Sequence, residues 1–356
     1  MASNFKYKLQ KNRTNLLVIG SILLFLVVGI GLYFLFTHDD WGDFKLGAEK
    51  KTLAESVISA DKNGTIVVFD TETKEKTSTF NLPNGNYLYT PNASYDGLYA
   101  YDGTRIHQLS IQKGKIKENG TLAEITVEGA ESFRTDGKNV AILSEEGQKL
   151  TYYYQKGGKW VTKVFEIPES VRDYAVIDGR LYYSTKTYLH LFDSEKETAI
   201  DLGDVTDTIT RFQDKILIHN RFGNALDNSI LLALEPGDLT ITELEETRSG
   251  KTSLIPADDD DETFYTVQYV DGSDPYYAVQ EWKLEDGNLN RNEKQLVKIP
   301  VEEDGVVYDH ETSVASKGYL YAHFNDRIDI FDIRSQNWYG SIAGVSETFV
   351  MPLLAD

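Results

Sequence analysis

The chain has 356 residues, a net charge of −20 and no cysteine. This length allows one large domain or two ordinary ones, and the lack of cysteine excludes disulfides, thiol catalysis and Cys-ligated zinc. A surface this acidic repels nucleic acid and anionic lipid headgroups, so neither is an expected partner. Aromatic residues make up 12% of the chain, which argues against a disordered stalk and for a packed core.

The first predicted element is an uncharged apolar run from Leu16 to Phe36. At about 1.5 Å per helical residue it reaches roughly 31 Å, enough to cross the hydrocarbon core of a bilayer. The preceding tail (1–15) is basic and contains no acid. Because basic residues concentrate on the cytoplasmic side, we predict a single-pass cell-membrane protein with a cytoplasmic N-terminus. An extracytoplasmic linker (37–52) would then lead to an extracellular main domain (53–356).

A cleaved signal peptide is the alternative interpretation of this run. Its apolar region would span about 7–15 residues and end in a small-x-small site. The run is longer and ends in bulky residues (33–36, YFLF), so we predict an uncleaved signal anchor. Its glycines form no G-x-x-x-G face, so the helix gives no evidence for homodimerisation. A large exported domain without cysteine resembles those of Gram-positive bacteria.

Beyond the linker, short apolar runs alternate with Asp-Gly, Asn-Gly and Gly-Lys turns, the pattern of many antiparallel strands. One unit recurs: a short apolar strand, a tight turn, a second strand often ending in Phe-Asp, a polar turn and a third strand. Copies start at intervals of roughly 36 to 56 residues, close to the ~40–50 of a four-stranded propeller blade. The seven copies begin near Ser56, Gly97, Lys138, Arg180, Lys215, Glu262 and Gly318.

A further predicted strand precedes each repeat after the first, as at residues 86–93, 171–177 and 208–212. The chain ends with one more strand, Glu347–Leu353, which no repeat follows. Closure of a ring explains both observations: the C-terminal strand would complete the first blade and bury edges that an open sheet exposes. We therefore predict an all-β fold, a seven-bladed β-propeller preceded by one N-terminal transmembrane α-helix. Six or eight blades, or two β-sandwich domains, are the alternatives.

Three of the repeats end a strand with an apolar-aromatic-Asp triplet, at residues 68–70, 191–193 and 330–332. In this respect the units resemble WD40-like and PQQ-like propeller repeats of membrane-anchored bacterial proteins, from about Leu53 to Leu353. The Gly-His and Trp-Asp signatures of WD40 repeats are missing, as is the regular Trp of PQQ-type blades. The resemblance therefore implies a fold and transfers no ligand residue.

The sequence shows no catalytic constellation. His107, His190, His219 and His323 lie in four different predicted blades without metal-ligand spacing, and we interpret them as structural or solvent-facing. Nucleotide-binding glycine motifs are absent. The run Asp258–Glu262 has enough carboxylates to hold calcium, but it lacks the spaced ligands and turn glycine of an EF-type loop. We predict a solvated loop there, and no catalytic residue, cofactor or metal.

Two connections between strands are longer than the others, at residues 221–228 in the fifth unit and 271–275 in the sixth. In a propeller both would emerge on one face from neighbouring blades. Long loops on a rigid scaffold are where recognition tends to be placed; loop-length variation without a function is the alternative. The predicted binding patch consists of Arg221, Phe222, Asp274 and Tyr276.

These features favour a non-enzymatic scaffold or accessory subunit that binds another cell-envelope or membrane protein. One alternative is a propeller that binds or hydrolyses cell-wall glycan, which clustered carboxylates or a groove lined by aromatic residues would favour. The second alternative is a ligand sensor. It would need a membrane partner, because the short cytoplasmic tail holds no signalling domain.

Overall fold

The computed structural model divides the chain into two compact units, Met1–Lys51 and Thr52–Asp356. Within the described part, no helix has both the length and the apolar character needed to cross a membrane. The predicted transmembrane run lies outside the described residues. The structure describes residues 53–92, 96–112, 114–203, 205–221, 229–247, 252–256, 263–270, 276–285, 288–291, 297–300, 314–316, 318–324, 326–333, 335, 337–346 and 348–353.

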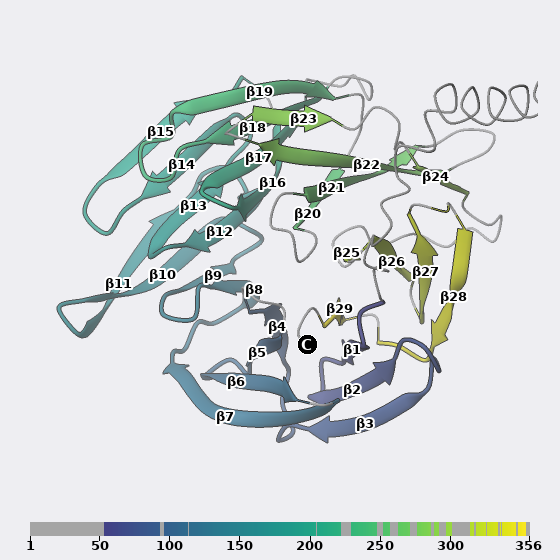
Figure 1. The fold of residues 1–356 in the computed structure, drawn as a ribbon. Coiled ribbons are helices and arrows are strands. Elements are labelled where there is room, and N and C mark those ends of the chain that lie inside the picture. Colours follow the sequence, from purple (N-terminus) through teal and green to yellow (C-terminus); the bar gives the residue numbers. More distant parts are fainter. Residues whose placement is uncertain are drawn as a thin grey trace, which may run out of the picture. The chain divides into compact units, whose positions relative to one another are not determined.

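The second unit is a seven-bladed β-propeller, as predicted (Figure 1). Each blade is an antiparallel sheet of four strands, and the sixth carries a fifth strand. From the inner to the outer strand, blades 1 to 3 are β29 (Phe349–Pro352), β1 (Ser56–Ala60), β2 (Thr65–Asp70), β3 (Lys76–Asn81); β4 (Leu88–Pro91), β5 (Gly97–Tyr101), β6 (Arg105–Gln112), β7 (Lys115–Glu124); and β8 (Ala130–Thr135), β9 (Val140–Ser144), β10 (Lys149–Lys156), β11 (Lys159–Glu166).

The remaining four blades follow the same order around the ring. Blades 4 and 5 are β12 (Asp173–Ile177), β13 (Arg180–Ser184), β14 (Tyr188–Phe192), β15 (Glu197–Asp201); and β16 (Val205–Phe212), β17 (Lys215–Arg221), β18 (Ser229–Leu234), β19 (Ile241–Thr247). Blades 6 and 7 are β20 (Thr252–Pro256), β21 (Thr263–Val270), β22 (Tyr276–Glu285), β23 (Asn288–Arg291), with β24 (Val297–Pro300) also paired to β22; and β25 (Val314–Ser316), β26 (Tyr319–Phe324), β27 (Arg327–Asp332), β28 (Asn337–Ala343).

The C-terminal strand closes the ring. β29 pairs antiparallel with β1, with Ile58 opposite Met351 and Ala60 opposite Phe349, so the prediction that this strand completes the first blade is confirmed. The extra strand predicted before each later repeat is also present, as β4, β12 and β16 show. Six blades, eight blades and paired sandwiches are therefore wrong.

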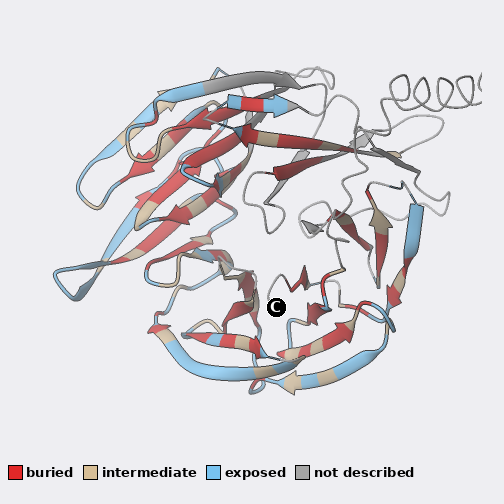
Figure 2. Ribbon diagram, viewed as in Figure 1, coloured by how far each residue is buried: buried red, intermediate tan, exposed pale blue. Residues whose placement is uncertain are grey.

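In blades 1 to 4 the second strand from the centre is the most buried and the outermost strand the least (Figure 2). All five residues of β1 and of β5 are buried, whereas β3 and β15 alternate between exposed and half-buried positions. The reason is that neighbouring blades cover both faces of the second strand, while the outermost strand lies at the rim. The core accordingly lies between blades: Ile58 and Val68 of blade 1 pack with Leu98 and Leu109 of blade 2.

The alternating strand direction gives the ring two distinct faces. In every blade the turn between the second and third strands lies at the same end as the connection from the fourth strand to the next blade. We call this end the connecting face. Leu53 leads into β1, the second strand of blade 1, so the chain enters the propeller at the opposite face.

Candidate functional site

A pocket of about 620 Å³ lies between blades 3 and 4. Its volume falls within the roughly 300–1,000 Å³ typical of small-molecule sites. It is lined by β11, by the start of the connection that follows β11, by the β13–β14 turn, and by side chains of β13, β14 and β15. That turn and that connection belong to the connecting face, so the pocket runs from this face along the groove between the two blades.

Aromatic side chains form one wall of the pocket. Phe165 of β11 and Tyr183 of β13 are both buried, and their ring centroids lie 5.6 Å apart. The strand alternation turns Phe165 toward blade 4 and leaves its neighbours Val164 and Glu166 exposed. The ammonium group of Lys163 lies 5.6 Å from the centroid of the Phe165 ring. The aromatic wall is therefore already in contact with a positively charged side chain of this protein, Lys163.

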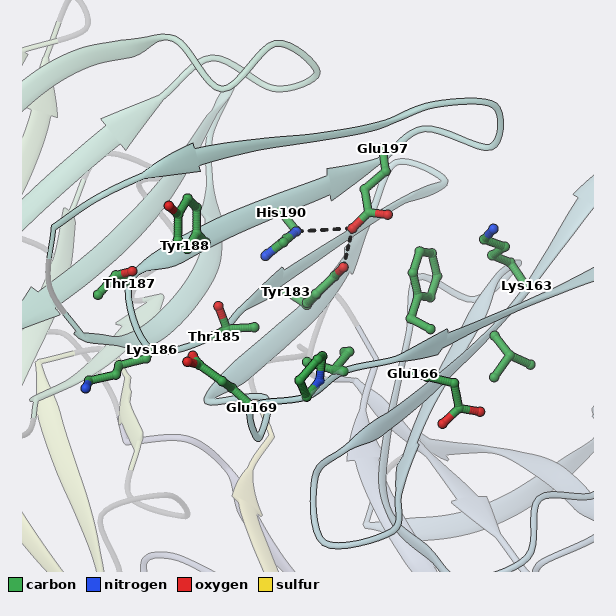
Figure 3. Close-up of a pocket in the computed structure, with 14 residues that line it drawn as sticks. Lys163, Glu166, Glu169, Tyr183, Thr185, Lys186, Thr187, Tyr188, His190 and Glu197 are labelled. Atoms are coloured by element: carbon green, nitrogen blue, oxygen red, sulfur yellow. Dashed lines mark hydrogen bonds and ion pairs between the residues drawn. The ribbon is translucent and has the colours of Figure 1, made fainter.

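Three adjacent strands of blade 4 bring Tyr183, His190 and Glu197 together (Figure 3). Tyr183 and His190 are register partners, and their rings stack with centroids 4.4 Å apart. One carboxylate oxygen of Glu197, Oε1, accepts a hydrogen bond from the Tyr183 hydroxyl and lies 3.1 Å from His190 Nδ1. Burial, with Glu197 beside it, raises the pKa of Tyr183. The phenol is therefore protonated at neutral pH and acts as a donor.

The pocket presents several groups to a ligand. Among the described residues, His190 Nε2 has no hydrogen-bond partner, and it lies on the side of the ring away from Glu197 (Figure 3). Tyr188, whose ring centroid is 6.2 Å from that of His190, is 45% exposed. A bound molecule would thus meet an aromatic ring, a ring nitrogen and a carboxylate held in place by two partners.

Blade 2 has a histidine at the same position in the repeat. His107 and His190 are each the third residue of the third strand of their blade, and Asp329 takes this place in blade 7. His107 Nδ1 lies 2.8 Å from Glu118, and its Nε2 lies 3.2 Å from Asp102. With Thr151 at the same place in blade 3, the repeat puts a polar side chain here in four blades.

The two histidines differ in access. Both nitrogens of His107 face carboxylates of its own blade, and Tyr87 packs with its ring centroid 6.0 Å away. Only 7% of the His107 side chain is exposed, compared with 22% for His190. Of the two, the histidine in blade 4 is the one available to a ligand.

Asp102 shows how firmly the site in blade 2 is closed. Burial raises the pKa of this carboxyl group, but the Thr104 hydroxyl and amide, the Arg105 amide and His107 all hydrogen-bond to it. These bonds outweigh burial and lower the pKa to about 2. Asp102 is therefore ionised at neutral pH, and its hydrogen bonds hold the turn between β5 and β6.

The predicted binding patch is described only in part. Arg221 is the last residue of β17, and Tyr276 is the half-buried first residue of β22. The topology places both at the connecting-face ends of neighbouring blades 5 and 6. Phe222 and Asp274 lie outside the described residues, so the patch stays a prediction.

The predicted calcium position also stays untested. Asp258–Glu262 lies outside the described residues, and among those that are described no group of three or more His, Asp or Glu side chains could hold a metal ion.

The pocket itself was not predicted. The sequence did contain one signal for it. Aligning residues 105–107, 188–190 and 327–329 shows that the third residue of each segment is a histidine or an aspartate.

No protein-family model matches the sequence, and no curated protein matches it either. Solved structures do resemble the fold. A functionally unknown protein from Desulfotomaculum acetoxidans DSM 771 aligns over 85% of this chain and 100% of its own, with 15% identity and a TM-score of 0.58. A putative 6-phosphogluconolactonase from Bacteroides fragilis NCTC 9343 aligns over 83% and 97%, with 14% identity and a TM-score of 0.52.

The β-propeller domain of Cps50 (Swd1) from Myceliophteria thermophila aligns over 74% of this chain and 88% of its own, with 9% identity and a TM-score of 0.50. At such low identities these likenesses show the propeller fold alone. Because one fold supports many unrelated activities, the function has to be argued from the surface of this chain.

Proposed function

We propose that this chain is a membrane-anchored, extracytoplasmic propeller that acts as a scaffold or accessory subunit in the cell envelope. It would bind another envelope or membrane protein through its connecting face. The observation that carries the proposal is the grouping of features on three consecutive blades. Blade 4 contributes one side of the pocket, and blades 5 and 6 contribute the ends from which the two long connections leave.

Several properties of the described residues support a protein as the partner. A specific interface covers about 800 Å² on each side, an area that three adjacent blades can supply. Interface cores favour aromatic side chains, and Tyr188 is exposed beside the pocket. The chain enters the ring at the opposite face. The net charge of −20 favours a partner with a basic contact surface.

Photo-crosslinking in intact cells tests the proposal. A crosslinking amino acid would replace Tyr188 or Arg221 on the connecting face, and Lys76 at the start of β3 would be the matched control. We expect the first two positions to capture one common envelope protein that the control position does not capture. Replacing residues 221–228 by a tight turn should reduce this capture. Equal capture from all three positions would contradict the proposal, as would hydrolysis of purified wall material without any captured partner.

The proposed topology has its own test. Protease added to intact protoplasts should degrade the propeller, and removing residues 16–36 should leave it unattached to the membrane. A propeller protected from protease, or one still in the membrane fraction after that deletion, would refute the topology.

A further inference from the structure

The pocket between blades 3 and 4 has a composition that suits one class of small molecule. We propose that it is a carbohydrate-binding site, in which Tyr188 stacks against a sugar ring and the His190–Glu197 pair binds the ring hydroxyls. This goes beyond the proposed scaffold function, because a saccharide would be recognised in addition to a protein partner. The site uses only described residues of blades 3 and 4.

An exposed aromatic ring beside a polar pocket is the first argument. A sugar ring has an apolar C–H face and a rim of hydroxyl groups, so it packs on an aromatic face while its rim is hydrogen-bonded. Of the pocket's aromatic side chains, Phe165 and Tyr183 are buried in the core, and Tyr188 is 45% exposed. An exposed tyrosine alone is ordinary, but this one adjoins unused hydrogen-bonding groups.

The second argument is that the polar groups are already in position. The Tyr183 hydroxyl and His190 Nδ1 both hold Glu197 Oε1, which leaves the other oxygen of the carboxylate for a ligand. A carboxylate accepts hydrogen bonds from hydroxyl groups, and the free His190 Nε2 can exchange one more. Because the chain fixes these groups beforehand, a ligand loses little of its binding energy to ordering them.

The charges around the pocket do not favour a strongly charged ligand. Lys163 and Lys186 line it together with Glu166, Glu169 and Glu197, so both signs are present. The Glu166 carboxylate is also 3.8 Å from a lysine ammonium group outside the pocket. Such a mixture of donors and acceptors suits a neutral molecule with many hydroxyl groups.

The comparison with blade 2 supports a ligand over a purely structural role. At the same repeat position, His107 forms contacts through both ring nitrogens to its own blade and is covered by Tyr87. A blade can therefore satisfy this histidine internally. In blade 4 the histidine faces a pocket of about 620 Å³, and its Nε2 is left without a partner among the described residues.

Calorimetric titration of the full-length protein tests this inference. The protein would be held in lipid nanodiscs, because alkyl-glycoside detergents carry sugar headgroups that would compete. The probes are chitotriose, cellotriose and maltotriose. We expect saturable binding of at least one of them, with an affinity about tenfold weaker in Tyr188→Ala and close to wild type in Tyr188→Phe. Tyr339→Ala in blade 7, where Tyr339 is 41% exposed, is the matched control and should bind normally.

Three results would overturn the inference: no saturable binding of any probe up to about 10 mM, unchanged affinity in Tyr188→Ala, or an equal loss in Tyr339→Ala. Thermal melts establish that each variant is folded. Glu197→Gln should also weaken binding, because it replaces a charged acceptor by a neutral amide. If the partner is captured but no saccharide binds, only the carbohydrate site is refuted. If a saccharide binds but no partner is captured, only the scaffold function is refuted.

Discussion

Closure of the ring by β29 can be tested by deleting residues 347–356. This change removes the strand that pairs with β1 and leaves the other six blades intact in sequence. It also exposes the inner edge of blade 1. We expect the truncated propeller to be unfolded, or to melt far below the intact protein.

The size of the effect follows from three buried side chains. Val350, Met351 and Leu353 are all buried, between blades 1 and 2 or between blades 7 and 1. Burial of one such side chain stabilises a fold by about 1.5–3 kcal/mol, so losing three costs about 5–9 kcal/mol. That is of the same order as the ~5–15 kcal/mol by which a domain is typically stable.

Circular dichroism during heating and during chemical unfolding measures the effect in the full-length protein. Met351→Ala should give a partial loss of about 2–5 kcal/mol, and deletion of residues 354–356 alone should change little. A synthetic peptide of residues 347–356 should restore part of the lost stability. If the protein lacking 347–356 melts at the same temperature as the intact one, β29 does not hold the ring closed and the reasoning is refuted.

Three smaller changes test other contacts. Asp102→Asn should destabilise the propeller at pH 7. The difference in unfolding free energy between variant and wild type should persist above the usual carboxyl pKa of 3.8 and shrink as the pH falls through about 2, where Asp102 of the folded protein is protonated. A difference independent of pH would contradict this. Gly97→Ala should cost about 1–3 kcal/mol, because its Cβ would lie 2.4 Å from the Leu109 carbonyl oxygen; an unchanged unfolding midpoint argues against that clash. Tyr183→Phe should cost about 1 kcal/mol through the lost bond to Glu197, and a more stable variant would show that this bond does not stabilise the fold.

The sequence was a good guide to the blades. Strand pattern and turn residues are local properties, so the start of each repeat could be recognised without knowing its neighbours. Ring closure was predicted because the strand Glu347–Leu353 had no repeat after it and the first unit lacked a preceding strand, and the pairing of β29 with β1 confirms it. The long connections were recognised for the same local reason, although residues 222–228 and 271–275 lie outside the described part of the chain.

The contacts of the pocket could not be predicted in this way. Glu197 is distant in sequence from Tyr183, and they meet because three adjacent strands present them on one face of blade 4. The sequence also does not show why Tyr87 covers one histidine while the equivalent one stays open. That difference depends on how the connections between blades pack.

The order of the strands and the number of blades therefore follow from local patterns of apolar and turn residues, because each blade repeats the same short pattern. The pocket, its hydrogen-bonded Tyr183–His190–Glu197 group and its position on the connecting face follow from packing between elements. Side chains from separate strands converge only when strand register and blade neighbours bring them to one groove. The pattern of residues along the chain specifies neither the strand register nor which blades become neighbours of the groove.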